Sequence, residues 1–166
     1  MYNRSMKSSI AAFKYGARKE YGRYYAAELA KKHESWIKKT GAQALIPVPI
    51  HKERHKKRGY NQAKVIADYL EGETGLPFID DYLIRIKNTE ALKELSAAER
   101  KASLEDAFLV SEASKLLYRN LRCVILVDDI YTTGSTINEC AATLKKSGVL
   151  KVYFLCACIG KDQGGE

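Results

Sequence analysis

Long apolar runs are missing from this 166-residue sequence, and so are the usual marks of export. No stretch approaches the roughly 20 apolar residues that a membrane-spanning helix requires. The first residues are polar and are interrupted by Lys7 and Lys14, so they lack the apolar block of a secretory signal. We therefore expect a cytoplasmic protein that does not insert into membranes.

Cysteine is scarce as well, and its spacing excludes the common zinc motifs. The four cysteines are Cys123, Cys140, Cys156 and Cys158, and no two of them form a CxxC pair. Cys156 and Cys158 lie two residues apart in an apolar run, where buried, reduced thiols on one face of a strand are the simplest interpretation. We therefore expect no bound zinc.

Acidic residues are outnumbered by basic ones. The chain has 28 lysines and arginines against 20 aspartates and glutamates, which gives a formal net charge of +8 and a pI of about 9.2. A basic surface attracts phosphate groups, whether they belong to a small metabolite or to nucleic acid. The length favours a single domain over residues 1–166, and the 46% of hydrophobic residues is typical of a folded globular chain.

Predicted strands alternate with predicted helices along the chain. Apolar residues at helical spacing predict two N-terminal helices within about residues 5–39, which separate near Gly16. The core follows over about residues 44–160, and its element order predicts an α/β fold with a central, mainly parallel sheet flanked by helices. Strands are expected at 44–50, 82–86, 108–110, 122–128 and 152–159, helices at 61–71 and 136–146, a charged loop at 51–59, and a long loop at 87–107 with a short helical piece at 96–101.

Two loops follow predicted strands at the end of the sheet where ligands of parallel α/β proteins bind, namely residues 51–62 and 128–136. In the second loop, a turn rich in hydroxyl groups leads directly into a helix. The N–H groups of the turn and the positive end of the helix dipole form a cup for a phosphate, and Gly134 lets the backbone approach the anion closely. Further donors are the hydroxyls of Thr132, Thr133, Ser135 and Thr136.

Asp128 and Asp129 precede this turn and need partners other than phosphate. Ionised carboxylates only accept hydrogen bonds, so ribose hydroxyls and a divalent cation suit them. Simple helix capping by Asp, Ser or Thr is common, but it does not require two acids after a buried strand and four hydroxyl residues around a glycine. The P-loop and the GxGxxG fingerprint are both absent. The pattern therefore favours a phosphorylated sugar.

The segment Val127-Asp-Asp-Ile-Tyr-Thr-Thr-Gly-Ser-Thr136 closely resembles the phosphoribosyl-diphosphate (PRPP) motif of type I phosphoribosyltransferases. The segment Leu45–Gln62, with its Pro-Val-Pro strand and Arg-Gly-Tyr-Asn-Gln turn, is similar to the ComF branch of that family. The resemblance covers nearly the whole chain and implies the type I phosphoribosyltransferase fold. It also implies that Asp128 and Asp129 contact the ribose, and Mg²⁺ bound with PRPP, while Thr132–Thr136 hold the 5-phosphate.

The basic stretch after the first core strand suits a diphosphate. Arg58 offers planar, bidentate donors, and Arg58, Asn61 and Gln62 lie where the loop passes into a helix. We predict these three residues as contacts of pyrophosphate or substrate. The catalytic candidates are Arg58, Asp128 and Asp129.

The long polar segment resembles the family's mobile loop, and by that resemblance Arg85, Lys87 and Arg100 belong to the substrate loop. Leu92 and Ser103 stand where relatives have Gln and Asn, which puts substrate identity and turnover in question.

Two further departures from the family narrow the prediction. Thr132 stands where hypoxanthine-type transferases place the Asp that serves as general base, so transfer to hypoxanthine or guanine is disfavoured. Members of the branch often carry an N-terminal, cysteine-rich zinc module, and this sequence starts after the place where it would lie.

Three functions stay open from the sequence. The first is transfer of phosphoribosyl from PRPP to a nitrogen acceptor, with Mg²⁺ bound through PRPP and pyrophosphate released. The second follows from the link of the ComF branch to DNA uptake in natural transformation. It is a component that binds single-stranded DNA and competence proteins, with basic side chains on the backbone and aromatics such as Tyr60 stacked on bases. The third is a regulator that senses PRPP. A homodimer is open in each case.

Overall fold

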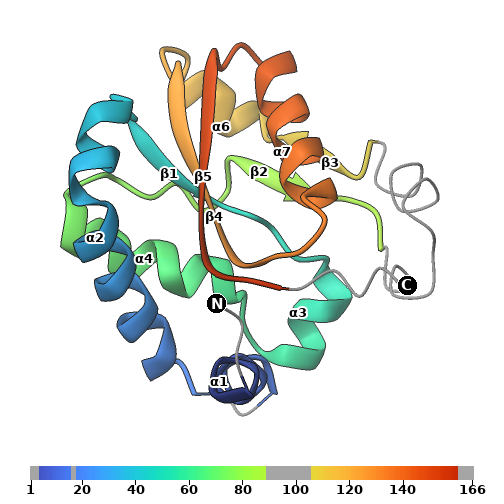
Figure 1. Cartoon of the computed structure of the whole chain (residues 1–166). Helices are drawn as coiled ribbons and strands as arrows, with labels where there is room; N and C mark the ends of the chain where they lie inside the picture. Colours follow the sequence, from blue (N-terminus) through green and yellow to red (C-terminus); the bar gives the residue numbers. More distant parts are fainter. Residues whose placement is uncertain (1–3, 16–17, 89–105, 161–166) are drawn as a thin grey trace, which may run out of the picture.

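The computed structural model describes residues 4–15, 18–88 and 106–160 (Figure 1). The N-terminal helices are α1 (Arg4–Tyr15) and α2 (Glu20–Thr40), as expected from their apolar spacing. The core strands are β1 (Ala44–Pro47), β4 (Cys123–Tyr131) and β5 (Lys151–Ile159), with β2 (Leu83–Arg85) and β3 (Phe108–Val110) beside them, and the other helices are α3 (Lys52–Arg58), α4 (Gln62–Thr74), α6 (Glu112–Leu117) and α7 (Ser135–Lys146).

The central sheet has the order β1-β4-β5, and both pairings are parallel. β2 and β3 form a separate antiparallel pair. Because β4 has a neighbour on each side, it is the most protected strand, which explains its continuously apolar sequence before the two acids. The predicted α/β fold with a central, mainly parallel sheet flanked by helices is confirmed.

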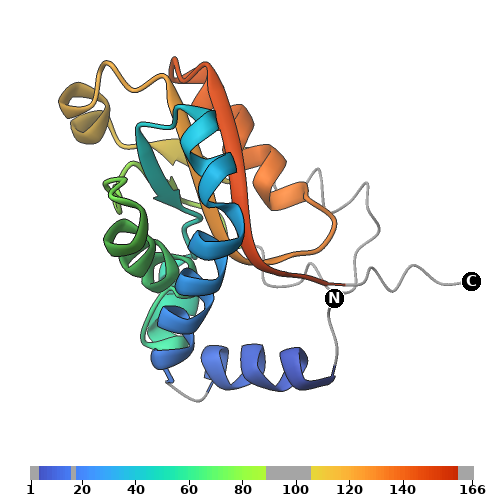
Figure 2. The ribbon, with the colours of Figure 1, turned by 60° about the vertical axis from the view of Figure 1, so that its left-hand side comes forward.

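Alternate side chains of β4 serve two different cores. Val124 and Leu126 pack with Leu144 of α7 in one cluster. Ile125 and Val127 pack with residues of α1, α2 and α4 in the other. Figures 1 and 2 show the same arrangement, with α2 and α4 on one face of the sheet and α7 on the other.

Local signals set the ends of the helices. Asn61 caps α4, since its side chain accepts a hydrogen bond from Ala63 N at 3.0 Å. Gly75, with φ of +72°, ends that helix three residues later than the sequence predicts. Gly72 therefore lies inside the helix.

The structure corrects three other sequence predictions. Residues 52–58 form α3, where a loop was expected, because His51 caps this helix by accepting a hydrogen bond from Glu53 N. β4 runs through both aspartates to Tyr131, because β5 continues alongside it as far as Ile159. The sequence prediction had no helix at α6, and it ended β4 at the first acid. The helical piece expected at 96–101 lies outside the described residues.

Within the described part of the chain, none of the helices is long and apolar enough to cross a bilayer.

Candidate PRPP and cation site

The two loops marked by the sequence meet at the carboxyl ends of β1 and β4. Val48 N donates to Val127 O at 2.9 Å, which ties the end of β1 to β4 just before the acids. α1, α3 and the turn between β4 and α7 all lie at this end of the sheet (Figures 1 and 2). This is the position where parallel α/β proteins bind their ligands.

The turn before α7 has the form of an anion cup. Gly134 is the residue before the helix and has φ of +78°, and the first N–H of the helix, from Ser135, donates to Thr133 Oγ1 at 3.5 Å. Ser135 Oγ and Thr133 Oγ1 lie 3.0 Å apart, partly buried, and Thr132 is exposed. The start of α7 therefore brings backbone N–H groups and hydroxyl groups together in one turn, the combination that binds a phosphate.

Glycine is required at position 134 by two independent features. A side chain at φ of +78° is strained. In addition, a Cβ atom built at this position would lie 2.6 Å from the Tyr131 hydroxyl. Tyr131 is held in turn by its stack on Phe154 of β5, with ring centroids 5.3 Å apart.

Asp128 is partly buried at the end of β4, and its Oδ1 accepts a hydrogen bond from Asp129 N at 2.8 Å. Burial raises the pKa of this carboxyl well above its ordinary value, and the charge of Asp129 raises it further. The carboxyl therefore favours a state in which a cation or a proton neutralises it.

Asp129 is buried and faces a cation from another element. Its Oδ2 lies 2.8 Å from Nζ of Lys14 in α1, and the two side chains are only 12% and 19% exposed. The contact is an ion pair without the alignment of a hydrogen bond, because Oδ2 accepts no hydrogen bond from the described residues. The atom is thus a buried acceptor with unused capacity.

Arg85 brings a second cation to this region from β2. The residue is 9% exposed, its Nε donates to Lys87 O at 3.3 Å, and its guanidinium lies 5.3 Å from the Phe108 ring centroid. Burial lowers the pKa of Arg85, and the nearby charge of Arg54 in α3 lowers it further, whereas Asp128 raises it. Lys14 of α1 and Arg85 of β2 therefore both interact electrostatically with Asp128.

Arg58, Asn61 and Gln62 form the turn between α3 and α4. Arg58 Nη1 donates to Gln62 Oε1 at 3.2 Å, and Asn61 Nδ2 donates to Val48 O at 3.0 Å. Gln62 is buried, and its Nε2 lies 3.5 Å from the carbonyl of Phe13, to which it donates. These amides join β1, α1 and α4, so they shape the site. Contact with a ligand stays a prediction for all three residues.

The remaining residues predicted for the site lie at its edge, outside the described residues, or in the core. Lys87 is exposed after β2, and Thr136 is partly buried in the first turn of α7. Arg100, like Leu92 and Ser103, lies outside the described residues. Tyr60 is 6% exposed, with its hydroxyl bound to the Phe13 carbonyl, so the expectation that it stacks on a base is wrong.

The acids fit a magnesium ion that arrives with its own oxygen ligands. The described residues contain no group of three or more His, Cys, Asp or Glu side chains that could enclose a metal. Mg²⁺ commonly binds through one or two carboxylates together with substrate phosphates. The buried Asp129 Oδ2, which pairs with Lys14 without accepting a hydrogen bond from the described residues, and the raised pKa of Asp128 match that donor set.

Lys14 is the site residue that sequence reasoning missed. It belongs to no recognisable motif and is one of several basic residues in its helix. Lys14 directly follows Phe13, which is fully buried. A large aromatic residue of this kind fixes the end of the helix, so the residue after it has a defined position. This is the signal that could have pointed to Lys14.

Comparison with known proteins identifies the relatives of the chain. No family model matches it. "Competence protein F" of Haemophilus influenzae is 39% identical over 111 residues, which cover 66% of this chain and 47% of that protein. "Competence protein ComFC" of Bacillus subtilis is 28% identical over 147 residues, which cover 89% and 56%. The chain belongs to the ComF-type family of these competence proteins.

This ComF-type chain spans about half the length of the curated relatives that it matches. "DNA utilization protein YhgH" of Escherichia coli K12 is 32% identical over 114 residues, which cover 69% of the chain and 48% of that protein. A solved structure described as the allosteric regulatory enzyme of purine biosynthesis aligns with a TM-score of 0.48 and 17% identity, over 82% of this chain and 25% of that chain.

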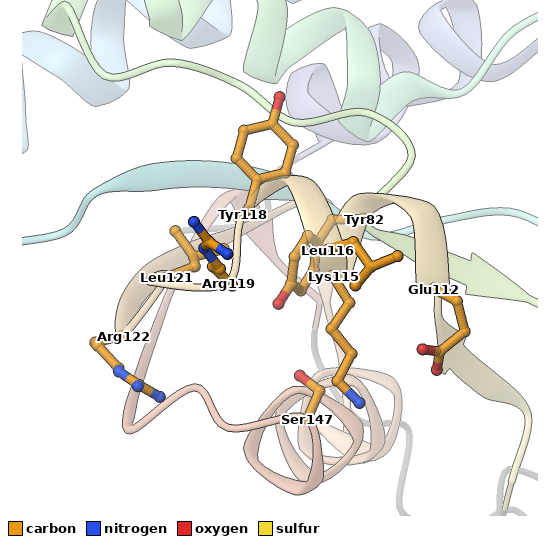
Figure 3. A pocket seen from close by; sticks show the side chains of 9 residues that line it. All are labelled: Tyr82, Glu112, Lys115, Leu116, Tyr118, Arg119, Leu121, Arg122 and Ser147. Atoms are coloured by element: carbon orange, nitrogen blue, oxygen red, sulfur yellow. The ribbon is translucent and has the colours of Figure 1, made fainter.

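The ComF-type domain also has a cavity at the opposite end of the sheet, between α6 and the end of α7. Its volume is about 340 Å³. Figure 3 shows Lys115 reaching from α6 toward Ser147 at the end of α7. The wall combines basic and apolar side chains, namely Tyr82, Glu112, Lys115, Leu116, Tyr118, Arg119, Leu121, Arg122 and Ser147.

Proposed function

We propose that this domain binds PRPP together with Mg²⁺ at the carboxyl end of β4 and transfers the phosphoribosyl group to a nitrogen acceptor, releasing pyrophosphate. The single observation that supports this most strongly is the pairing of an anion cup with two adjacent carboxylates. The cup lies at Gly134 and the N-terminus of α7, and the carboxylates are Asp128 and Asp129, a few residues before it.

Each part of PRPP has a suitable partner in this arrangement. The 5-phosphate would lie in the cup, where backbone N–H groups and the hydroxyls of Thr133 and Ser135 donate to it. The ribose hydroxyls and Mg²⁺ would lie against Asp128 and Asp129, whose carboxylates, once ionised, supply only acceptors. The diphosphate would extend toward the basic residues contributed by other elements, namely Lys14, Arg54, Arg58 and Arg85.

The chemistry requires fixed charges more than a protein nucleophile. Departure of pyrophosphate leaves positive charge on the ribose ring, and the leaving group carries negative charge. Asp128 and Asp129 would stabilise the first, while Arg58 and Arg85 would stabilise the second. The backbone of β4 and the turn at Gly134 would hold the ribose and the 5-phosphate in a fixed position for the reaction.

PRPP binding is tested by titrating the protein with Mg²⁺ and PRPP in a calorimeter. Asp129→Asn should weaken binding about tenfold to a hundredfold, because it removes a charged acceptor from the site. Asp68→Asn on the exposed face of α4 is the matched control and should bind like the wild type. Absence of binding to the wild type would reject the proposal.

Turnover is tested separately by incubating the protein with PRPP and a panel of nucleobases and measuring released pyrophosphate. Release with one base identifies a transferase and its acceptor. Binding without release for every base would instead support a PRPP-sensing regulator.

A DNA-binding role is the second candidate, favoured by α3. This helix contains Lys52, Arg54, Lys56, Lys57 and Arg58, and none of its residues is buried. The names of the relatives refer to competence and to DNA utilization. Affinity for a single-stranded oligonucleotide should then fall steeply with salt, whereas a flat dependence would count against binding to the phosphate backbone.

A further inference from the structure

Lys14 lies inside the proposed PRPP site although it belongs to the first helix. Its Nζ is 2.8 Å from Asp129 Oδ2, and both side chains are largely withdrawn from water. The desolvation of two buried charges can offset their attraction, so the pair is weak evidence for a stabilising role. A role in ligand binding is therefore worth considering for it.

The position of Lys14 is fixed by the residue before it. Phe13 is fully buried, and its ring contacts Tyr25 and Tyr60 with centroid separations of 5.9 and 5.8 Å. Its carbonyl accepts hydrogen bonds from the Tyr60 hydroxyl and the Gln62 amide. The end of α1 is thus attached to α2 and to the turn that precedes α4. These contacts fix the backbone of Lys14 at a position from which its ammonium reaches Asp129.

The lysine and a divalent cation would compete for the same atom. Asp129 Oδ2 is the buried oxygen that accepts no hydrogen bond in the described residues, and the Lys14 ammonium is the charge beside it. Lys14 also lowers the pKa of Asp128, although burial and Asp129 together raise it. In the free protein, the ammonium therefore supplies part of the positive charge that Mg²⁺ would otherwise supply.

We infer that Lys14 is a ligand-binding residue that pairs with Asp129 in the free protein and moves to a diphosphate oxygen when Mg²⁺ and PRPP bind together. The inference rests on the proposed function, because it takes PRPP as the ligand. The ammonium is at the end of a flexible four-carbon chain, so it can change partners while the helix stays in place. No bond is made or broken in this exchange.

The exchange makes binding of the metal depend on PRPP. Without PRPP, Mg²⁺ must displace the ammonium from Asp129 and leave that ammonium with no partner. With PRPP, the diphosphate receives the ammonium and the carboxylates are released to the cation and the ribose. Removing the ammonium should therefore strengthen binding of the metal alone and weaken binding of PRPP.

These opposite effects are measured on Lys14→Met, which keeps most of the side-chain volume. Binding of Mn²⁺ alone, followed by the loss of the free-ion signal in electron paramagnetic resonance, should become at least about threefold tighter. Calorimetry with Mg²⁺ and PRPP should show binding about tenfold to a hundredfold weaker, as expected for a lost charge-assisted hydrogen bond. Lys14→Arg retains the charge and should lie closer to the wild type in both measurements.

The control is Lys38→Met, which removes the same charge from a lysine that is 74% exposed and paired with Glu34 on the surface of α2. It should change neither affinity. If Lys14→Met binds Mg²⁺ and PRPP as the wild type does, or weakens metal and PRPP together, the inference is overturned while the proposed function stands. If the wild type binds no PRPP, the proposed function itself fails, and the exchange fails with it.

Discussion

The two ends of the parallel sheet both carry positive charge, but they differ in how far that charge is withdrawn from water. At the carboxyl end, Arg85 and Asp129 are buried and Lys14 is largely withdrawn from water. At the amino end, Lys115 and Arg119 line a cavity of about 340 Å³ and remain exposed. Burying charge costs free energy, and buried, perturbed charges gather at functional sites more than elsewhere. Desolvated charge, and not the presence of a cavity, is therefore the reason to place the proposed function at the carboxyl end.

The largest effect should come from Gly134→Ala at the carboxyl end. The new methyl group would meet the Tyr131 hydroxyl while the backbone keeps φ of +78°, so we expect a loss of about 1–3 kcal/mol in the free energy of unfolding and loss of PRPP binding. Urea denaturation and calorimetry measure the two effects.

Gly72→Ala is the matched control for this change. Gly72 lies inside α4, and a Cβ atom there would meet no other atom within 4 Å. Alanine should therefore stabilise the protein by up to about 1 kcal/mol. Equal effects of the two substitutions would show that the turn at Gly134 is an ordinary surface turn.

Asp128→Asn should have opposite effects on the stability of the protein and on its affinity for PRPP. Because burial and the charge of Asp129 raise the pKa of Asp128 in the folded protein, its protonated form is stabilising at acid pH. That contribution is lost as the pH rises from the unfolded value near 3.8 through the raised pKa. The asparagine variant should thus gain stability relative to the wild type between pH 4 and pH 7, by about 0.5–2 kcal/mol, and bind PRPP more weakly.

Thermal unfolding of both proteins across this pH range gives the difference directly. A difference that stays constant or shrinks toward pH 7 would mean that Asp128 is not destabilised by its surroundings. In that case, charge at the carboxyl end would not differ in its free-energy cost from the exposed charge at the amino end.

The smallest effect is expected at the amino end. Replacing Lys115 and Arg119 by alanine removes exposed cations from the cavity of Figure 3, so the free energy of unfolding should change by less than about 0.5 kcal/mol. PRPP affinity should stay within about twofold of the wild type. A larger loss of PRPP affinity would place ligand binding at this end as well.

The sequence predicted best what depends on neighbouring residues. β4, the turn at Gly134 and α7 follow one another directly, so the apolar run, the acids and the glycine were enough to predict the strand, the turn and the helix that form the candidate site. The α/β order followed from similar local patterns. α3 was missed because none of its residues is buried, so it shows no apolar spacing. α6 was missed because it is only six residues long and leaves Leu116 and Leu117 exposed.

Contacts between distant segments could not be predicted in the same way. The ion pair of Lys14 with Asp129 joins residues more than a hundred positions apart and depends on the burial of Phe13. Similarly, Tyr60 reads as an exposed aromatic beside a basic stretch, and only the docking of α1 makes it a buried donor. Such pairings require the whole fold.

The carbonyl of Phe13 accepts hydrogen bonds from both Tyr60 and Gln62. One backbone oxygen therefore couples the first helix to the turn that is expected to face pyrophosphate. A shortened version of the chain that began at α2 would retain the sheet and both conspicuous motifs, yet it would lack the peptide group on which that turn rests. Any minimal domain chosen for crystallisation or for transplantation into another protein should accordingly begin before Ile10.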